Sequence, residues 1–234
     1  MKKIVFTFLS LSIVLVVLFS SHLTNASEVS AASKVNAAVK KPSVVPKIRN
    51  SQYNHDSDLN YPQVFGLTNK AVQDKINTTF KNHIIKSAEN KKQLLQNQSK
   101  QNPEWSYITA FDVEYNKNDK LSIIIYDYQY TGGAHSEGYA QTYNFSLKTG
   151  EIIRLNDILK NDENYTKVQK YAYHTMMKDE RFNIASLNEV VVNKETPPQY
   201  VYSDNGIKLV FQLYEVAPYS EGHPKVYIPS SVYK

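Results

Sequence analysis

The stretch from 128 to 139 combines glycine, histidine and tyrosine in a way that favours a bend with binding chemistry, since three of the seven glycines lie within it. Gly132 and Gly133 permit backbone angles that other residues resist, so the chain can bend there and bring backbone amides toward a ligand. The candidate binding residues of this stretch are Tyr130, Thr131, Gly132, Gly133 and His135. The alternative is a structural kink in which a backbone carbonyl satisfies His135.

A second unusual stretch, from 214 to 224, is an aromatic loop stiffened by two prolines. Such stiffening lowers the entropy lost on binding, and loops carried on a sheet are common contact surfaces. Pro218, Tyr219 and His223 are its candidate binding residues, although the loop could also fold back and bury Tyr219. Because a sheet can bring distant loops to one rim, we expect the two stretches to form a single contact face.

Signatures of common catalytic sites are absent from the sequence. It has no Gly-x-Ser-x-Gly elbow, His-Glu-x-x-His helix, Walker loop or dinucleotide-binding glycine pattern. The chain also lacks cysteine, which excludes disulfides, thiolate catalysis and cysteine-bound metals. A metal site of His135, Glu137 and His223 would need distant loops to converge. We therefore expect no catalytic residue, metal or cofactor.

Residue periodicity predicts the elements that carry these stretches. Val72, Ile76, Phe80 and Ile84 form an apolar stripe that predicts a helix from Asn69 to about Gln98. Alternating or apolar runs predict strands at 111–115, 121–130, 139–147 and 152–155, then a helix at 163–179 and strands at 200–202, 208–215 and 226–228. The expected fold class is α+β: a mostly antiparallel β-sheet with helices packed on one face, in two small lobes.

The N-terminus has the pattern of a secretory signal peptide. Two lysines precede an apolar run of about 16 residues, shorter than the roughly 20 that span a bilayer. Thr24-Asn25-Ala26 offers a cleavage site, with Ser30-Ala31-Ala32 as a second candidate. The alternative is an uncleaved N-terminal anchor. We expect a signal peptide at 1–26, a flexible spacer at 27–50, an N-terminal lobe at 51–110 and a C-terminal domain at 111–234.

The net charge gives little support for a nucleic-acid partner. The formal charge is +5, and the basic residues are scattered, whereas nucleic-acid binding needs a clustered basic face. The densest basic group, between 34 and 49, lies in the predicted spacer. It either keeps that segment soluble or contacts anionic wall polymer or lipid headgroups.

Several motifs in order resemble a known family. They are Tyr-x-Tyr-Thr-Gly-Gly-Ala-His at 128–135, Phe-x-x-x-Thr-Gly at 145–150, Leu-x-Asp at 155–157, Tyr-Glu-Val-Ala-Pro-Tyr-x-x-Gly at 214–222 and Val-x-Ile-Pro at 226–229. Together with Tyr61-Pro62-Gln63 and Lys75-Ile76-Asn77, they resemble extracytoplasmic bacterial domains found in the outer part of the anti-sigma factor RsiV and the N-terminal region of the peptidoglycan deacetylase PdaC. The resemblance covers about 55–234. One departure is Ser136, where the family usually has a third glycine.

This resemblance implies recognition rather than catalysis, because the outer part of RsiV binds lysozyme. The N-terminal lobe would be PdaC-like and the C-terminal domain RsiV-like. The expected function is a secreted or cell-surface, non-catalytic binding module for a lysozyme-type hydrolase or the cell-wall glycan. It would contact a membrane only through an uncleaved N-terminal segment. The alternative is an enzyme or accessory protein that acts on peptidoglycan.

The leader pattern generates the first testable prediction. N-terminal sequencing of the protein recovered from the cell surface or medium should begin after Ala26, or after Ala32 if the second site is used. Recovery of intact Met1-Lys2-Lys3 in that fraction would instead identify the segment as an anchor.

Overall fold

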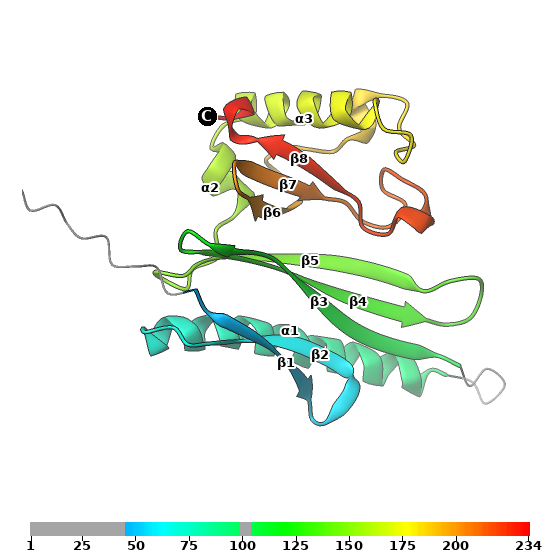
Figure 1. Ribbon diagram of the computed structural model, residues 1–234. Helices are drawn as coiled ribbons and strands as arrows, with labels where there is room; N and C mark the ends of the chain where they lie inside the picture. The colour runs from blue at the N-terminus through cyan, green and yellow to red at the C-terminus, as the bar shows by residue number, and fades with distance from the viewer. Residues whose placement is uncertain (1–44, 99–103) are drawn as a thin grey trace, which may run out of the picture. The chain divides into compact units, whose positions relative to one another are not determined.

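The strands form two sheets, each covered by one long helix (Figure 1). A computed structural model describes residues 45–98 and 104–234, so the predicted signal peptide and most of the predicted spacer lie outside the described residues. The α+β class predicted from the sequence is confirmed. The strands are divided between two sheets rather than forming one.

The first sheet has five strands in the order β1-β2-β3-β4-β5. Its elements are β1 (Lys47–Tyr53), β2 (Asp56–Phe65), α1 (Lys70–Gln96), β3 (Ser106–Lys117), β4 (Lys120–Tyr130) and β5 (Glu137–Ser146). Neighbouring strands pair antiparallel except β2 and β3, which meet in parallel at Leu59 and Thr109. Asn54-His55 and Asn118-Asp119, which have positive φ, close two of the hairpins, as turns of the primed types require.

The predicted helix, α1, packs its apolar stripe against this sheet. Asn69 caps the helix by accepting a hydrogen bond from the Val72 amide at 3.3 Å. The predicted stripe is buried among Leu121, Ile123 and Ile125 of β4 and Phe145 of β5. The lysine-rich and glutamine-rich last turns are largely exposed.

Strand β4 is buried on both faces, which explains its near-continuous apolar sequence. Its odd-numbered residues face α1, whereas Ile124 and Tyr126 pack with Ala140, Val201 and Val210. Val201 and Val210 belong to the second sheet, so β4 packs against α1 on one face and against the second sheet on the other.

The second sheet has three antiparallel strands in the order β6-β7-β8. Its elements are α2 (Leu155–Leu159), α3 (Asp162–Met176), β6 (Gln199–Ser203), β7 (Gly206–Val210) and β8 (Lys225–Pro229), with short 3-10 turns at Leu187–Glu189, Tyr219–Glu221 and Ser230–Val232. Val168, Ala172 and Met176 of α3, the helix predicted at 163–179, are buried on this sheet. Asp204-Asn205 forms the turn between β6 and β7.

Buried side chains of the first sheet satisfy the free edge of β6. Ser122 donates to Asn144 Oδ1 at 2.6 Å, and Asn144 Nδ2 donates to the Tyr200 carbonyl at 2.7 Å. The Tyr202 amide donates to Ser122 Oγ at 2.9 Å. An edge strand exposes unpaired amides and carbonyls. We call Ser122 and Asn144 the polar joint. The polar joint supplies the hydrogen-bond partners that β6 lacks on its edge side.

Two glutamine side chains from the second part of the chain occupy the outer edge of β5 in the same manner. Gln212 accepts from the Ala140 amide at 2.9 Å and donates to the Ala140 carbonyl at 3.0 Å. Gln199 Oε1 accepts from the Thr142 amide at 2.8 Å and from its hydroxyl at 2.7 Å. At Ala140 and Thr142 the backbone edge of β5 is therefore paired by side chains, whereas Asn144 and Ser146 pair with the backbone of residues 151–153.

Several predicted boundaries are wrong. Strand β1 begins at Lys47, inside the predicted spacer at 27–50, because its backbone pairs with β2. The predicted division at 110/111 cuts β3, which pairs with β4 along its length. Residues 152–155 form only an isolated bridge between Ile152 and Phe145. Strand β7 ends at Val210, five residues early, because the chain leaves the sheet for the aromatic loop.

Within the described ranges, no helix has the length and apolar character needed to cross a membrane.

The polar joint predicts a large stability effect at Asn144. Asn144→Ala leaves Ser122 and the Tyr200 carbonyl short of a buried partner, so the free energy of unfolding should fall by about 3 kcal/mol. Denaturant unfolding measures this change, and Asn188→Ala is the matched control because Asn188 is exposed. Equal stability of the two variants would contradict a structural role for the joint.

Candidate functional site

The two stretches chosen from the sequence meet in space. The β4–β5 hairpin loop and the loop between β7 and β8 come together where His135 contacts Tyr214 and Tyr219. The Tyr214 hydroxyl lies 2.7 Å from His135 Nε2, and the His135 ring stacks on Tyr219 with centroids 3.9 Å apart and planes at 17°. The expected convergence of the two loops is confirmed. We call His135, Tyr214 and Tyr219 the aromatic cluster.

The hairpin loop has the backbone geometry that its glycines allow. Gly132 and Gly133 adopt φ values of 105° and 101°, which side-chain-bearing residues rarely adopt. Tyr130 closes the loop by donating its hydroxyl to the Gly133 carbonyl at 2.9 Å, and Thr131 is exposed at its start. Ser136, the departure from the family motif, does not have a positive φ, so this bend needs no third glycine.

Tyr214 is strained in a way that the sequence does not reveal. Its φ is 62°, a left-handed conformation that is an outlier for a bulky residue, and the residue is 62% exposed. Backbone strain of this kind persists where the surrounding structure imposes it and is concentrated at functional sites. Pro218 is exposed and precedes the 3-10 turn that carries Tyr219, which is half-buried against His135.

His223, by contrast, packs inward and lies outside the aromatic cluster. Its ring packs against Tyr126 and Tyr128 with centroids 5.3 and 6.2 Å away. Its Nδ1–H donates to the Phe211 carbonyl at 3.2 Å, while Nε2 is buried without a hydrogen-bond partner among the described residues. Burial lowers the pKa of His223, and the Lys225 charge lowers it further against the opposing effect of the backbone hydrogen bond. His223 therefore supports the loop from beneath.

A second polar site, which was not predicted from the sequence, surrounds Asp127 of β4. The Nε2–H of His83 donates to Asp127 Oδ2 at 2.8 Å. Ser87 and Tyr107 donate to Asp127 Oδ1 at 2.5 and 2.8 Å. His83 Nδ1 lies 2.8 Å from the Tyr143 hydroxyl. We call these five residues the Asp127 network.

Burial, hydrogen bonds and nearby charges set the protonation states of Asp127 and Tyr143 in the network. Burial alone would raise the pKa of Asp127, but the hydrogen bond and charge of His83, with donors Ser87 and Tyr107, lower it overall. Burial and then the Asp127 charge raise the pKa of Tyr143 to about 12. Asp127 is therefore ionised at neutral pH, and the Tyr143 hydroxyl is neutral.

The order carboxylate–imidazole–hydroxyl matches that of nucleophilic triads. A nucleophile needs an activated hydroxyl, however, and the raised pKa of Tyr143 opposes activation. The hydrogen bonds of the Asp127 network also hold the side chains of His83, Ser87 and Tyr107 in place. Among the described residues, no group of three or more histidine or acidic side chains is placed to hold a metal ion.

One sequence signal could have revealed this site. Asp127 is the only acidic residue in the otherwise apolar and aromatic strand at 121–130. A charge in such a strand must be paired or hydrogen-bonded when buried. Its partner His83 is 44 residues away on α1, and that pairing is spatial.

Two family models match consecutive parts of the chain. The model described as "Deacetylase PdaC" matches residues 48–137, and the model described as "Protein of unknown function (DUF3298)" matches residues 156–231. Each model covers less than half of the chain, and together they support the resemblance to PdaC and DUF3298 domains. The first match includes the Asp127 network except Tyr143, and the second includes the loop that carries Tyr214 and Tyr219.

Known relatives agree with this assignment. The chain is 29% identical over 118 residues to the peptidoglycan-N-acetylmuramic acid deacetylase PdaC of Bacillus subtilis (strain 168), a match that covers 49% of this chain and 25% of the deacetylase. It thus spans about a quarter of that protein.

Two crystal structures of DUF3298-family proteins share the fold at 16% identity. The one from Bacteroides fragilis NCTC 9343 has a TM-score of 0.54 and covers 80% of this chain and 89% of that protein. The one from Pseudomonas aeruginosa PAO1 has a TM-score of 0.57 and covers 81% of this chain and 93% of that protein.

The lowered pKa of Asp127 predicts a pH dependence of stability. A carboxyl whose pKa is lower in the folded state stabilises the fold above the ordinary carboxyl pKa of about 4, and this contribution is lost as pH falls through the lowered value. Asp127→Asn should therefore lower the free energy of unfolding by about 2 kcal/mol at pH 7 and flatten its decrease below about pH 4.

Chemical denaturation between pH 2 and pH 7 tests this prediction. Asp74→Asn is the control, because Asp74 is exposed on α1 and has no hydrogen bond or ion pair within the described residues. The prediction fails if Asp127→Asn and Asp74→Asn show the same pH profile.

Proposed function

We propose that the chain is an extracytoplasmic, non-catalytic binding module that recognises a lysozyme-type wall hydrolase through the aromatic cluster. The observation that carries this proposal is the convergence of His135, Tyr214 and Tyr219 from two loops that are far apart in sequence. A fold that needed only to connect its strands would not require a strained, exposed tyrosine at this point.

The cluster has the chemistry of a protein-binding hot spot. Tyrosine supplies a large apolar face with a polar tip and is enriched at the energetic centre of interfaces. The stack of His135 on Tyr219 and the contact of Tyr214 with His135 hold the rings in place before binding. A preorganised surface loses less conformational entropy when a partner docks. The resemblance to the lysozyme-binding outer part of RsiV supports a hydrolase as that partner.

Two observations support a location outside the cytoplasm. The N-terminal sequence has the basic start, apolar run and small residues of a signal peptide. The name of the curated relative says that it acts on peptidoglycan, which is a wall polymer.

The alternative, an enzyme that acts on peptidoglycan, is favoured by one feature, the carboxylate–imidazole–hydroxyl order of the Asp127 network. Mass spectrometry of wall fragments incubated with the purified protein tests it directly, and we expect no cleaved or deacetylated product. Dose-dependent products that disappear in His83→Ala would establish the enzyme instead.

Truncation of the stacked tyrosine should weaken binding without unfolding the protein. Tyr219→Ala should reduce the affinity for lysozyme by about 2 kcal/mol, or about thirtyfold. Calorimetric titration measures this loss, and a thermal melt of the same variant detects any unfolding. Tyr171→Ala is the matched control, because Tyr171 is an exposed tyrosine on α3. A stable Tyr219→Ala variant with unchanged affinity would remove Tyr219 from the site.

The strained tyrosine allows function and stability to be separated. Tyr214→Gly removes the ring but suits a φ of 62°, so the melting temperature should stay the same or rise slightly. Lysozyme affinity should nevertheless fall about tenfold, as for an ordinary interface tyrosine. Lower stability with unchanged affinity would show that Tyr214 serves the fold alone.

A further inference from the structure

The apolar core between α1 and the first sheet turns polar at one end. Along the buried face of α1, Ile76, Phe80 and Ile84 are followed by Ser87, which is also buried. On the same side of β4, Leu121, Ile123 and Ile125 are followed by Asp127 and Gln129. The buried side of α1 and the facing side of β4 therefore change from apolar to polar residues at the same end of the core. Local packing alone does not require this coincidence.

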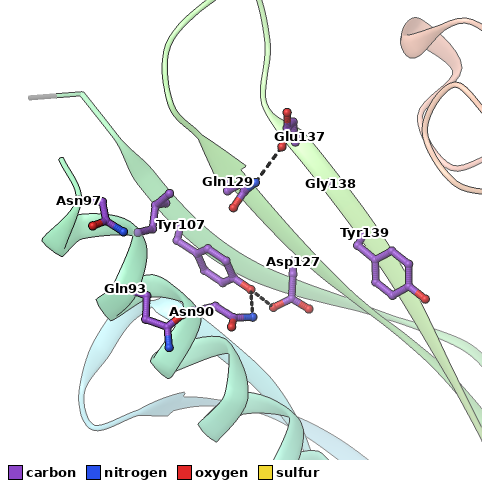
Figure 2. Close-up of a pocket in the computed structure, with 10 residues that line it drawn as sticks. Asn90, Gln93, Asn97, Tyr107, Asp127, Gln129, Glu137, Gly138 and Tyr139 are labelled. Atoms are coloured by element: carbon purple, nitrogen blue, oxygen red, sulfur yellow. Dashed lines mark hydrogen bonds between the residues drawn. The ribbon is translucent and has the colours of Figure 1, made fainter. Parts of the chain in front are cut away.

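This polar end opens into a groove. Two adjoining cavities of about 450 and 540 Å³ share four lining residues, Asn90, Tyr107, Asp127 and Tyr139. These volumes lie in the usual range for ligand sites, roughly 300–1,000 Å³. Figure 2 shows helix amides on one side, β4 and β5 on the other, and Tyr107 and Asp127 between them. We call this feature the helix groove.

The groove wall is rich in groups that both donate and accept hydrogen bonds. Side-chain amides come from α1, from its C-cap residue and from the strands, namely Asn82, Asn90, Gln93, Asn97, Gln129 and Gln141. Within the described residues, the side chains of Gln93 and Asn97 and the Tyr139 hydroxyl have no hydrogen-bond partner. Tyr139 is 49% exposed, so its ring is available as a flat contact face.

The charge of the groove argues for a neutral ligand. Asp127 is the central acid, but His83, Ser87 and Tyr107 already satisfy both of its oxygens. Its role is to fix Tyr107 at the groove floor rather than to bind a cation. The other charged lining groups are one lysine and one glutamate, Lys86 and Glu137, and Glu137 accepts a hydrogen bond from Gln129 at 2.8 Å. Neither an anion nor a cation is favoured overall.

We propose that the helix groove binds a neutral oligosaccharide that carries N-acetyl groups. Unpaired amides match both the hydroxyls and the acetamido groups of such a sugar, because each amide donates and accepts. The exposed Tyr139 ring offers a platform for a pyranose face. The groove shares no residue with the aromatic cluster, so this site is independent of the proposed hydrolase-binding face.

NMR titration of the purified protein with N-acetylchitotetraose tests the proposal, and cellotetraose, which has the same linkage but no acetamido groups, is the matched ligand. We expect saturable shifts of groove residues with the first sugar and at least tenfold weaker binding of the second. Equal binding of the two sugars, binding of neither, or shifts confined to other surfaces would overturn it.

Two variant pairs locate the binding. Tyr139→Ala should weaken chitotetraose binding about tenfold, whereas Tyr139→Phe, which keeps the ring, should lose about threefold or less. Gln93→Ala should lower the affinity for chitotetraose about fivefold, as expected for the loss of one neutral hydrogen bond. Gln96→Ala should leave this affinity unchanged, because Gln96 does not line the groove.

Two further measurements keep these results interpretable. A thermal melt of each variant separates lost binding from lost folding. Tyr219→Ala should bind chitotetraose normally, so a failure of the glycan site and a failure of the hydrolase-binding face are distinguishable. Equal losses in Gln93→Ala and Gln96→Ala would overturn the assignment to the groove.

Discussion

The hydrogen bonds that Ser122 and Asn144 supply to β6 are the interaction on which the rest of the structure depends. Strand β6 is at the edge of its sheet, and its buried carbonyl at Tyr200 and amide at Tyr202 have no strand partner on that side. A buried unpaired backbone group is costly, so the two sheets can pack only where these polar groups align. That alignment also fixes the loop between β7 and β8 beside the β4–β5 hairpin, and the aromatic cluster follows from it.

The helix groove and the loop that carries His223 contact opposite faces of β4. Because side chains alternate along β4, Asp127 and Gln129 face α1 and line the groove, whereas Tyr126 and Tyr128 face the loop that carries His223. Gly138 lies opposite Tyr128 in the register, and a Cβ there would come within 2.5 Å of the Tyr128 ring. The glycine is thus required by the close approach of that ring, and the hairpin carries structural constraints on both of its faces.

Local patterns predicted much of this fold, and spatial pairings account for what they missed. The stripe from Val72 to Ile84, the turn at Asp204-Asn205 and the bend at Gly132-Gly133 are set by residues close in sequence. The β1–β2 hairpin was not predicted, because apolar and polar residues alternate only weakly in its two strands. The parallel contact of β2 with β3 and the pairing of Asp127 with His83 join residues tens of positions apart. The surrounding structure imposes the left-handed conformation of Tyr214. The residue type does not predict this conformation, because tyrosine rarely adopts it.

The glutamines along β5 have a consequence for how the protein behaves at high concentration. An exposed strand edge is a template on which another chain can add a strand and begin an aggregate. Gln199 and Gln212 occupy that edge with side-chain hydrogen bonds, which present no continuing ladder to a neighbouring molecule. With no disulfide to hold it, this protection lasts only while the second sheet stays docked, so transient separation of the sheets is the step that exposes the chain to self-association.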